Sequence, residues 1–278
     1  MSSLWDLLAV APGPVDLASI DTRATPGVKS REAADASRDA IGSELGDLQE
    51  RLRAQSTVGK RGRLLVVLQG MDTSGKDGAI KKGLRGTNPK WLQIASFGKP
   101  TEGELAHHFL WRVRKELPEP GMIGVFDRSH YEDVLVVRVR GLVPEEVWRP
   151  RYDEVNAFER QLADDGVRIV KVFLHISRDY QKERQLRRLE RVDKRWKFNE
   201  ADLEDRERWD DFQVAYAEAI ERCSTPIAPW FVVPADRKWY RTWAVSKLVL
   251  ETLREMDPQY PPREDLDIEA LKARLLAS

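Results

Sequence analysis

The amino-acid sequence predicts an α/β protein in which a parallel sheet lies between two layers of helices. Two observations carry this prediction. Short apolar runs recur along the 278 residues without polar alternation, as in strands that are buried on both faces. Segments with helical periodicity separate these runs, and strands that alternate with helices form parallel sheets covered on both sides.

The elements follow in chain order. Prolines interrupt the first 29 residues, and a helix is then predicted over 30–55, with an apolar stripe of Ile41, Leu45, Leu48 and Leu52. Strands are predicted over 64–68, 93–97, 122–126, 167–174 and 230–233. Helices are predicted over 78–86, 102–117, 144–164, 179–190, 200–223 and 238–256. We expect an N-terminal extension over 1–60, a core domain over 61–256, and a tail over 257–278 that begins as an extended strap or frayed end.

Composition excludes several classes of protein. The 41% hydrophobic and 33% charged residues do not fit collagen-like, disulfide-rich or wholly disordered chains. No apolar run is long enough to span a membrane, and the N-terminus lacks the pattern of a secretory signal. The single cysteine, Cys223, can form neither an intramolecular disulfide nor a zinc site. We expect a cytoplasmic protein without a membrane partner, and the 46 basic and 46 acidic residues predict no nucleic-acid partner.

A phosphate-binding loop follows the first predicted strand. The sequence GMDTSGKDG begins at Gly70, and Gly70, Gly75 and Lys76 have the spacing G-x-x-x-x-G-K. Glycines let backbone N–H groups approach an anion, the N-terminus of the next helix points at it, and the lysine supplies a positive charge. Gly78 is a further candidate phosphate-binding position. The alternative is a glycine-rich turn with a surface lysine.

Two acidic residues distinguish this loop from the usual pattern. Asp77 stands where Ser or Thr would place a hydroxyl on magnesium, and Asp72 lies inside the loop. Asp72 is predicted to be a metal ligand or a base next to a phosphate oxygen. The alternative is that Asp72 or Asp77 caps the following helix, which suits Asp77 better.

The third predicted strand ends in FDRSHYED, from Phe126 to Asp133. An aspartate after an apolar strand is the second magnesium element of phosphate-loop enzymes. Since the carboxyl ends of parallel strands line the ligand crevice, we expect Asp127 to lie near Lys76. Arg128 is predicted to clamp a transferring phosphoryl group, and Glu132 to lie near the same rim. His130 is predicted to be a hydrogen-bonded scaffold residue, and direct catalysis by it is the less favoured alternative.

A basic run between residues 178 and 197 contains nine Lys and Arg against four Asp and Glu. Two helices joined by a basic turn predict a lid over about 178–210 that closes on phosphates. Arg184, Arg188 and Arg191 have helical spacings that place them on one face. The alternative is a solvated pair of helices.

Four stretches together resemble the polyphosphate kinase 2 family: GMDTSGKDG, FDRSHYEDVLV, DKRWKF with RERWDDF, and TPIAPWFVVPADRKWYR. The resemblance covers about residues 64–253. It implies a phosphate-loop kinase fold with a helical lid, and magnesium-dependent, reversible phosphoryl transfer between inorganic polyphosphate and nucleotides. It also implies a dimer or tetramer.

The resemblance assigns roles to residues by position. Asp72, Lys76, Asp127 and Arg128 match the catalytic residues of the loop and strand end, with Asp72 and Asp127 on magnesium. Basic residues after the loop and in the lid match those that face polyphosphate: Lys81, Lys82, Arg184, Arg188, Arg191, Lys194 and Arg195. The segment His130-Tyr131-Glu132 resembles the subclass that converts AMP to ADP and ADP to ATP. Glu132 would then help to hold a metal or orient the acceptor.

Two other functions stay open. An ATP-dependent nucleotide kinase shares the phosphate loop and an arginine-bearing lid, although Asp72 and Asp77 speak against it. A non-catalytic sensor of polyanions or nucleotides on the same fold would bind without turnover.

Overall fold

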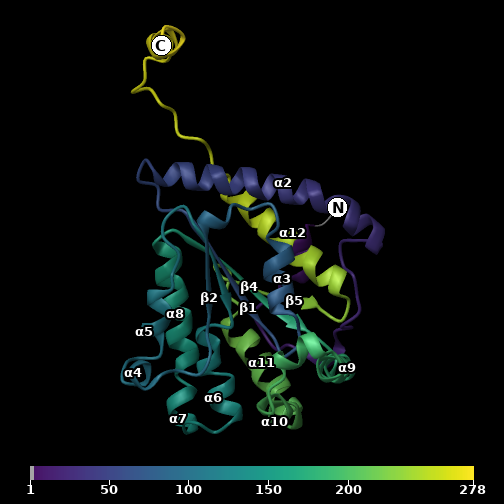
Figure 1. The fold of residues 1–278 in the computed structure, drawn as a ribbon. Coiled ribbons are helices and arrows are strands. Elements are labelled where there is room, and N and C mark those ends of the chain that lie inside the picture. The colour runs from purple at the N-terminus through teal and green to yellow at the C-terminus, as the bar shows by residue number, and fades with distance from the viewer. Residues whose placement is uncertain (1–2) are drawn as a thin grey trace.

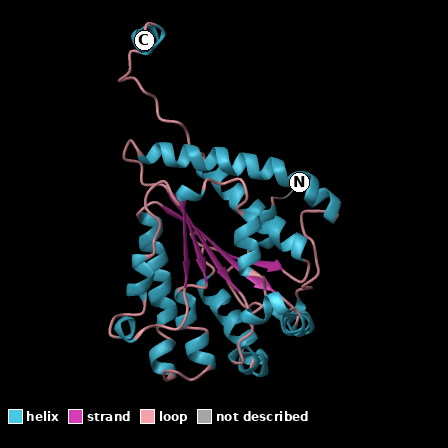
Figure 2. Ribbon diagram, in the orientation of Figure 1, coloured by secondary structure: helices cyan, strands magenta, loops and turns pink. Residues whose placement is uncertain are grey.

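The computed structural model describes residues 3–278 and confirms the α/β/α fold with a parallel sheet. The five strands lie in the order β2-β3-β1-β4-β5 and every pair of neighbours is parallel. Figures 1 and 2 show the twisted sheet between helices. The strands are β1 (Arg63–Gln69), β2 (Leu92–Ser96), β3 (Ile123–Asp127), β4 (Val167–His175) and β5 (Trp230–Pro234).

The central strand places the phosphate loop beside the end of β3. All seven residues of β1 are buried, which its apolar sequence predicts for a strand covered on both faces. In the register of the sheet Leu68 lies opposite Asp127. The loop that starts at Gly70 therefore leaves the sheet next to the carboxyl end of β3.

Two groups of helices flank the sheet. One group joins α2 (Arg31–Ser56), α3 (Lys76–Gly83) and α12 (Lys238–Met256), with α1 (Leu4–Leu8) against α12. The other joins α8 (Arg151–Asp164) and α11 (Trp209–Cys223), with α6 (Val136–Val139) against α11. In α2 the predicted stripe of Ile41, Leu45, Leu48 and Leu52 is buried, which confirms that this helix packs on the core.

Three helices that the sequence predicts as continuous are each divided in two in the structure. Residues 102–117 form α4 (Glu102–Leu105) and α5 (Leu110–Lys115), because the ring Nδ1 of His108 accepts the Leu110 N–H in the break. The segment 144–164 divides into α7 (Glu145–Trp148) and α8 at Pro150, whose ring cannot donate to the preceding turn. The third, 200–223, divides at Arg208 into α10 (Ala201–Glu207) and α11.

The tail departs from the body as expected and then forms an additional helix. Asp257 ends α12 in the left-handed conformation, with φ 43°. An extended stretch leads to α13 (Ile268–Leu276), which the sequence did not predict and which stands clear of the body in Figure 1. The predicted division into domains stays a prediction. Among residues 3–278, none of the helices is both long and apolar enough for a membrane span.

Candidate functional site

The phosphate loop depends on two glycines. Gly70 and Gly75 have φ values of 147° and 95°, which L side chains rarely adopt. A Cβ on Gly70 would lie 2.8 Å from the Leu174 carbonyl oxygen, and a Cβ on Gly75 would collide with the guanidinium of Arg241. The loop therefore keeps its shape only with glycine at both positions. No such constraint applies at Gly78, in the first turn of α3, where a Cβ would meet ordinary contacts.

Lys76 lies at the centre of the predicted catalytic residues. It begins α3 and is buried, and its Nζ donates to the Gly70 carbonyl oxygen at 2.9 Å. Burial lowers the pKa of Lys76, and Arg128 lowers it further, while Asp127, Asp72 and Glu132 act in the opposite direction. The structure thus brings together the five residues predicted to be catalytic: Asp72, Lys76, Asp127, Arg128 and Glu132.

Asp127 offers a carboxylate oxygen that the protein leaves without a partner. Its Oδ1 is buried and accepts no hydrogen bond from residues 3–278. Burial raises the pKa of Asp127 against the attraction of Lys76, and Asp77 raises it further. A buried carboxylate oxygen without a hydrogen-bond donor can bind a cation, or a proton donor carried by a ligand.

The residues present fit magnesium bound together with a substrate. Within residues 3–278 there is no group of three or more His, Cys, Asp or Glu that could hold a metal. Magnesium is commonly bound by one or two carboxylates, with waters and substrate phosphates as the remaining ligands. The carboxylates of Asp127 and Asp72 both attract the Lys76 ammonium. These two side chains can supply the carboxylate ligands.

The strand end places Arg128 in an unusual backbone conformation. Its φ is 64°, which costs about 1 kcal/mol or more for a residue with a Cβ. The Arg128 N–H donates to the Leu68 carbonyl oxygen at 3.0 Å, and Nη1 lies 3.3 Å from Glu132 Oε2. The attraction of Glu132 raises the pKa of Arg128. Glu132 lies at the rim, as predicted, and orients the guanidinium.

A buried polar network anchors the segment that follows Arg128. Tyr131 Oη donates to Glu159 Oε1 at 2.9 Å, and His130 Nε2 lies 3.2 Å from the same oxygen. Lys171 Nζ donates to Glu159 Oε2 at 2.5 Å. All four side chains are buried. His130 therefore lies in the scaffold under the rim, as the favoured prediction had it.

Two ion pairs join the predicted lid to the loop and the start of α3. Arg188, from α9 (Arg178–Glu190), donates to Asp72 through both Nη atoms at 2.7 and 3.3 Å. Lys197 Nζ lies 2.7 Å from Asp77 Oδ2. The alternative in which Asp77 caps α3 is wrong, because Gly75 is the N-cap residue and Asp77 lies in the first turn.

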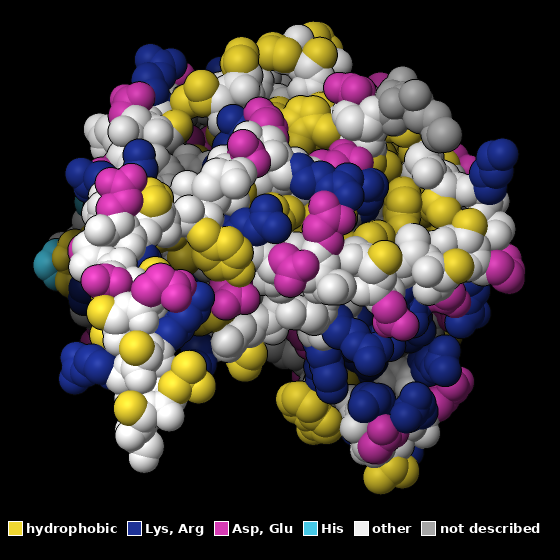
Figure 3. Space-filling view, turned by 90° about the horizontal axis from the view of Figure 1, so that it is seen from above, with side chains coloured by type: hydrophobic (Ala, Val, Ile, Leu, Met, Phe, Trp, Pro, Cys, Tyr) yellow, Lys and Arg dark blue, Asp and Glu magenta, His cyan; other side chains and the backbone are white. Residues whose placement is uncertain are grey.

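The other predicted basic residues have different environments. Arg191 is the C-cap residue of α9, its N–H donates to the Arg187 carbonyl oxygen, and its side chain pairs with Asp193. That Arg184, Arg188 and Arg191 share one face stays a prediction. Lys194 also pairs with Asp193, and Arg195 donates to the Leu189 carbonyl oxygen. Lys and Arg side chains crowd the lower right of Figure 3, on the side where α9 lies in Figure 1.

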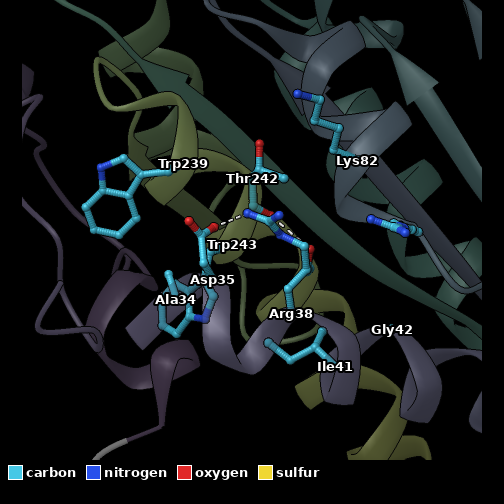
Figure 4. A pocket seen from close by; sticks show the side chains of 11 residues that line it. Ala34, Asp35, Arg38, Ile41, Gly42, Lys82, Trp239, Thr242 and Trp243 are labelled. Carbon is cyan, nitrogen blue, oxygen red and sulfur yellow. Dashed lines mark hydrogen bonds and ion pairs between the residues drawn. The ribbon is translucent and has the colours of Figure 1, made fainter. Parts of the chain in front are cut away.

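Lys81 and Lys82 lie at the far end of α3 from the loop. Both are exposed in its last turn. Lys82 lines a small cavity between α2, α3 and α12, together with Arg38 and Trp239 (Figure 4). The structure does not place these two lysines among the catalytic cluster.

Sequence reasoning missed two residues at the site. Asp202, in α10, lies 3.5 Å from Arg188. Burial and the neighbouring Asp72 raise its pKa to about 6. Arg241, in α12, is buried and donates to the Ser74 and Ala235 carbonyl oxygens, which braces the loop. Neither has a local signal, because each reaches the loop from more than 100 residues away.

A groove of about 730 Å³ opens beside the rim. It follows the end of β2, where Ser96 pairs in register with Asp127 and the Phe97 N–H donates to the Asp127 carbonyl oxygen. Its other wall comes from α4, α5 and the break between them, and includes His107, Trp111, Arg112 and Lys115. The rings of His107 and Trp111 stack with centroids 4.0 Å apart. The Trp111 ring also contacts Lys115 Nζ, which lies 3.3 Å from its centre. The positive charge next to Asp127 suits an anionic ligand.

Comparisons with known proteins agree with this geometry. The model of a family described as polyphosphate kinase 2 matches residues 29–261. An AMP/ADP-polyphosphate phosphotransferase of Meiothermus ruber is 50% identical over 88% of this chain and 89% of its own length. An ADP-polyphosphate phosphotransferase of Rhodopseudomonas palustris is 40% identical over 89% of this chain and 88% of its own. The crystal structure of a polyphosphate kinase 2 from Arthrobacter aurescens superposes with a TM-score of 0.96 at 41% identity, covering 100% of this chain and 98% of that one.

Proposed function

The chain belongs to the polyphosphate kinase 2 family, and from this premise we propose that it transfers phosphoryl groups between inorganic polyphosphate and both AMP and ADP. The observation that carries the proposal is the cluster of Lys76, Asp127 and Arg128 beside a loop shaped for phosphate. Phosphoryl transfer needs in-line positioning and neutralisation of charge more than covalent chemistry by the protein. The cluster supplies both.

Each side chain has a distinct task in this proposal. The loop N–H groups and Lys76 hold the phosphates on either side of the transferred group. Arg128, oriented by Glu132, offsets charge that develops on the equatorial oxygens. Asp72 and Asp127 would hold magnesium, which supplies charge neutralisation and a fixed geometry for phosphate oxygens. The attacking oxygen of a nucleotide phosphate is already ionised, so these carboxylates need not remove a proton from it.

The groove beside β2 is the proposed site of the acceptor nucleotide. It adjoins Asp127 through the register of β2 and β3, and its volume lies within the range of small-molecule sites. Arg112 and Lys115 offer positive charge to a monophosphate or diphosphate. We therefore place polyphosphate on the side of the lid and the nucleotide on the side of β2.

The lid holds polyphosphate by exchanging its internal ion pairs. Arg188 is paired with Asp72 in this structure, and it can exchange this partner for a phosphate of the polymer. Both side chains of the pair keep some contact with water, so a multiply charged ligand can compete for the arginine. Affinity for the polymer should fall with salt.

The test is the formation of nucleotides from AMP, and separately from ADP, with polyphosphate as the only phosphoryl donor and magnesium present. Chromatography should show ADP and ATP from AMP, and ATP from ADP. Product from ADP alone would contradict the AMP step and the role of Glu132 in it. Product with ATP but none with polyphosphate would identify an ATP-dependent kinase instead, and binding without any product would identify a sensor.

A further inference from the structure

Asp236, in the loop between β5 and α12, joins three distant parts of the chain. It is buried, and its Oδ1 accepts the Ser177 N–H at 3.0 Å. Its Oδ2 accepts the hydroxyls of Ser177 and Thr22, both at 2.8 Å. The Asp236 N–H in turn donates to the Thr22 carbonyl oxygen at 3.1 Å. The loop is thereby tied both to the start of α9 and to the segment that connects α1 with α2.

These contacts do more than cap α9. Ser177 is the N-cap residue, and its own hydroxyl oxygen accepts the Tyr180 N–H at 3.1 Å, which is the ordinary task of a serine at this position. The cap therefore needs no carboxylate. Asp236 binds both the N–H and the hydroxyl of Ser177, and two contacts on one residue fix the direction in which the helix leaves the sheet.

The connecting segment is itself held on both sides of Thr22. On one side, the ring Nε2 of His175 donates to the carbonyl oxygen of Leu17 at 2.9 Å, and the Leu17 side chain is buried. On the other side, Tyr240 Oη donates to the Pro26 carbonyl oxygen at 3.0 Å. In Figure 1 this segment is the dark purple trace that runs down to α9 on the right. The threonine hydroxyl is therefore a donor that is fixed in place.

The direction of α9 decides where its far end lies. Beyond its cap and outside the lid, the hydrogen bonds that α9 makes with residues 3–278 end at Asp72, from Gln181 and Arg188. At a rise of 1.5 Å per residue, Arg188 lies about 16 Å along the helix from Ser177, so a tilt of about 10° at the cap displaces it by about 3 Å. That displacement is enough to separate Arg188 from Asp72, which it contacts at 2.7 Å.

We propose that Asp236 is a positioning residue for polyphosphate, and that it acts by joining the cap residue Ser177 to Thr22. The inference rests on the proposed function, in which the lid binds the polymer. When Arg188 exchanges Asp72 for a phosphate, the bonds to Asp236 remain and keep α9 in its direction. The segment between α1 and α2 thus contributes to polymer binding without touching the polymer.

Distances between two spin labels test this inference without catalysis. Labels on Leu186→Cys in α9 and Glu50→Cys in α2 report the direction of the lid against the core, since both positions are exposed. Cys223 is buried and stays unlabelled. The doubly labelled parent should give one narrow distance distribution by pulsed electron paramagnetic resonance. Asp236→Ala, which removes the three acceptor contacts, should shift its mean by about 3 Å or at least double its width, and an unchanged distribution would overturn the proposal.

A matched pair of valine variants tests the part played by the connecting segment. Thr22→Val keeps the shape of the side chain but removes the donor to Asp236, and it should broaden the distribution even if Asp236→Ala does not fold. Thr25→Val is the control, because Thr25 bonds the Val28 N–H through its carbonyl oxygen, which the substitution keeps. Equal broadening by both variants, or by neither, would overturn the proposal.

Kinetics separates positioning from a loss of folded protein. Asp236→Ala should raise the KM for polyphosphate about tenfold, and Thr22→Val about threefold, because hydrogen bonds to a charged group are lost and the lid is misplaced. The KM for ADP should not change, since the proposed acceptor groove lies on the side of β2. A smaller folded fraction would lower kcat alone, and that result or an equal rise in both KM values would overturn the proposal. If the parent protein forms no product from polyphosphate, the proposed function fails, and the label distances still decide whether Asp236 sets the direction of α9.

Discussion

Different interactions hold the segment of Arg128 and Glu132 and the predicted lid. Arg128 and Glu132 lie on a segment anchored by Glu159 and the three buried side chains around it. The lid rests on the loop through Arg188–Asp72 and Lys197–Asp77, pairs that water reaches. Buried networks hold one geometry, while exposed ion pairs exchange at little cost. The segment of Arg128 and Glu132 is therefore held in one position, whereas the contacts of the predicted lid can exchange, as the proposed function requires.

The largest effect is expected from the rim itself. Asp127→Asn keeps the size of the side chain but removes the charge, and it should lower kcat about a thousandfold because preorganised charge at the reacting group is lost. Steady-state kinetics with polyphosphate and ADP would measure this. Asp211→Asn, an exposed acidic residue at the start of α11, is the control and should stay within twofold. An Asp127→Asn enzyme with a tenth of the original kcat would refute the assigned role.

Removing one partner of the buried network around Glu159 should strongly destabilise the folded protein. Lys171→Met leaves Glu159 charged and buried, and the free energy of unfolding should fall by about 3–5 kcal/mol. Adding Glu159→Leu should recover part of that loss, since two apolar side chains replace the pair. Urea denaturation of the two variants tests this. A double variant less stable than Lys171→Met would contradict it.

The same pair predicts a dependence of stability on pH. Burial by itself would raise the pKa of Glu159, but Lys171 and His130 outweigh it and hold the pKa below the ordinary value of 4.5. The native state therefore binds its proton at lower pH than the unfolded state does. The stability from this carboxylate is present above pH 4.5 and is lost as the pH falls through the native pKa. Between pH 6 and pH 3.5, Glu159→Gln should lose less stability than the parent protein, and equal losses would show that Glu159 does not contribute.

The smallest effect on folding is expected in the lid. Arg188→Ala should lower the free energy of unfolding by less than Lys171→Met does, because Asp72 and Asp202 keep some contact with water whereas Glu159 keeps almost none. The KM for polyphosphate should rise about tenfold, since a hydrogen bond to a charged group is worth ~1.5 kcal/mol. Arg191→Ala is the matched comparison, as its ion pair is with Asp193 two residues away. A KM effect as large for Arg191→Ala would show that the lid acts only as a diffuse positive surface.

Local sequence determined most of the fold and the core of the site. Apolar runs such as Leu64–Leu68 form strands wherever they can be buried on both faces, and the order of strands and helices then requires a parallel sheet. The spacing of Gly70, Gly75 and Lys76 specifies the loop, because the backbone conformations involved exclude other side chains. Asp127 and Arg128 follow from their place at a strand end.

Only the tertiary structure decided which distant groups meet. Arg241 reaches the loop across 167 residues and Arg188 reaches Asp72 across 116, and contacts at such separations leave no periodic signal in either segment. Helix ends show the same limit. The helix predicted over 200–223 divides at Arg208 into α10 and α11. The sequence determines periodicity and backbone preference, whereas helix ends and ion pairs depend on what the folded chain places beside them.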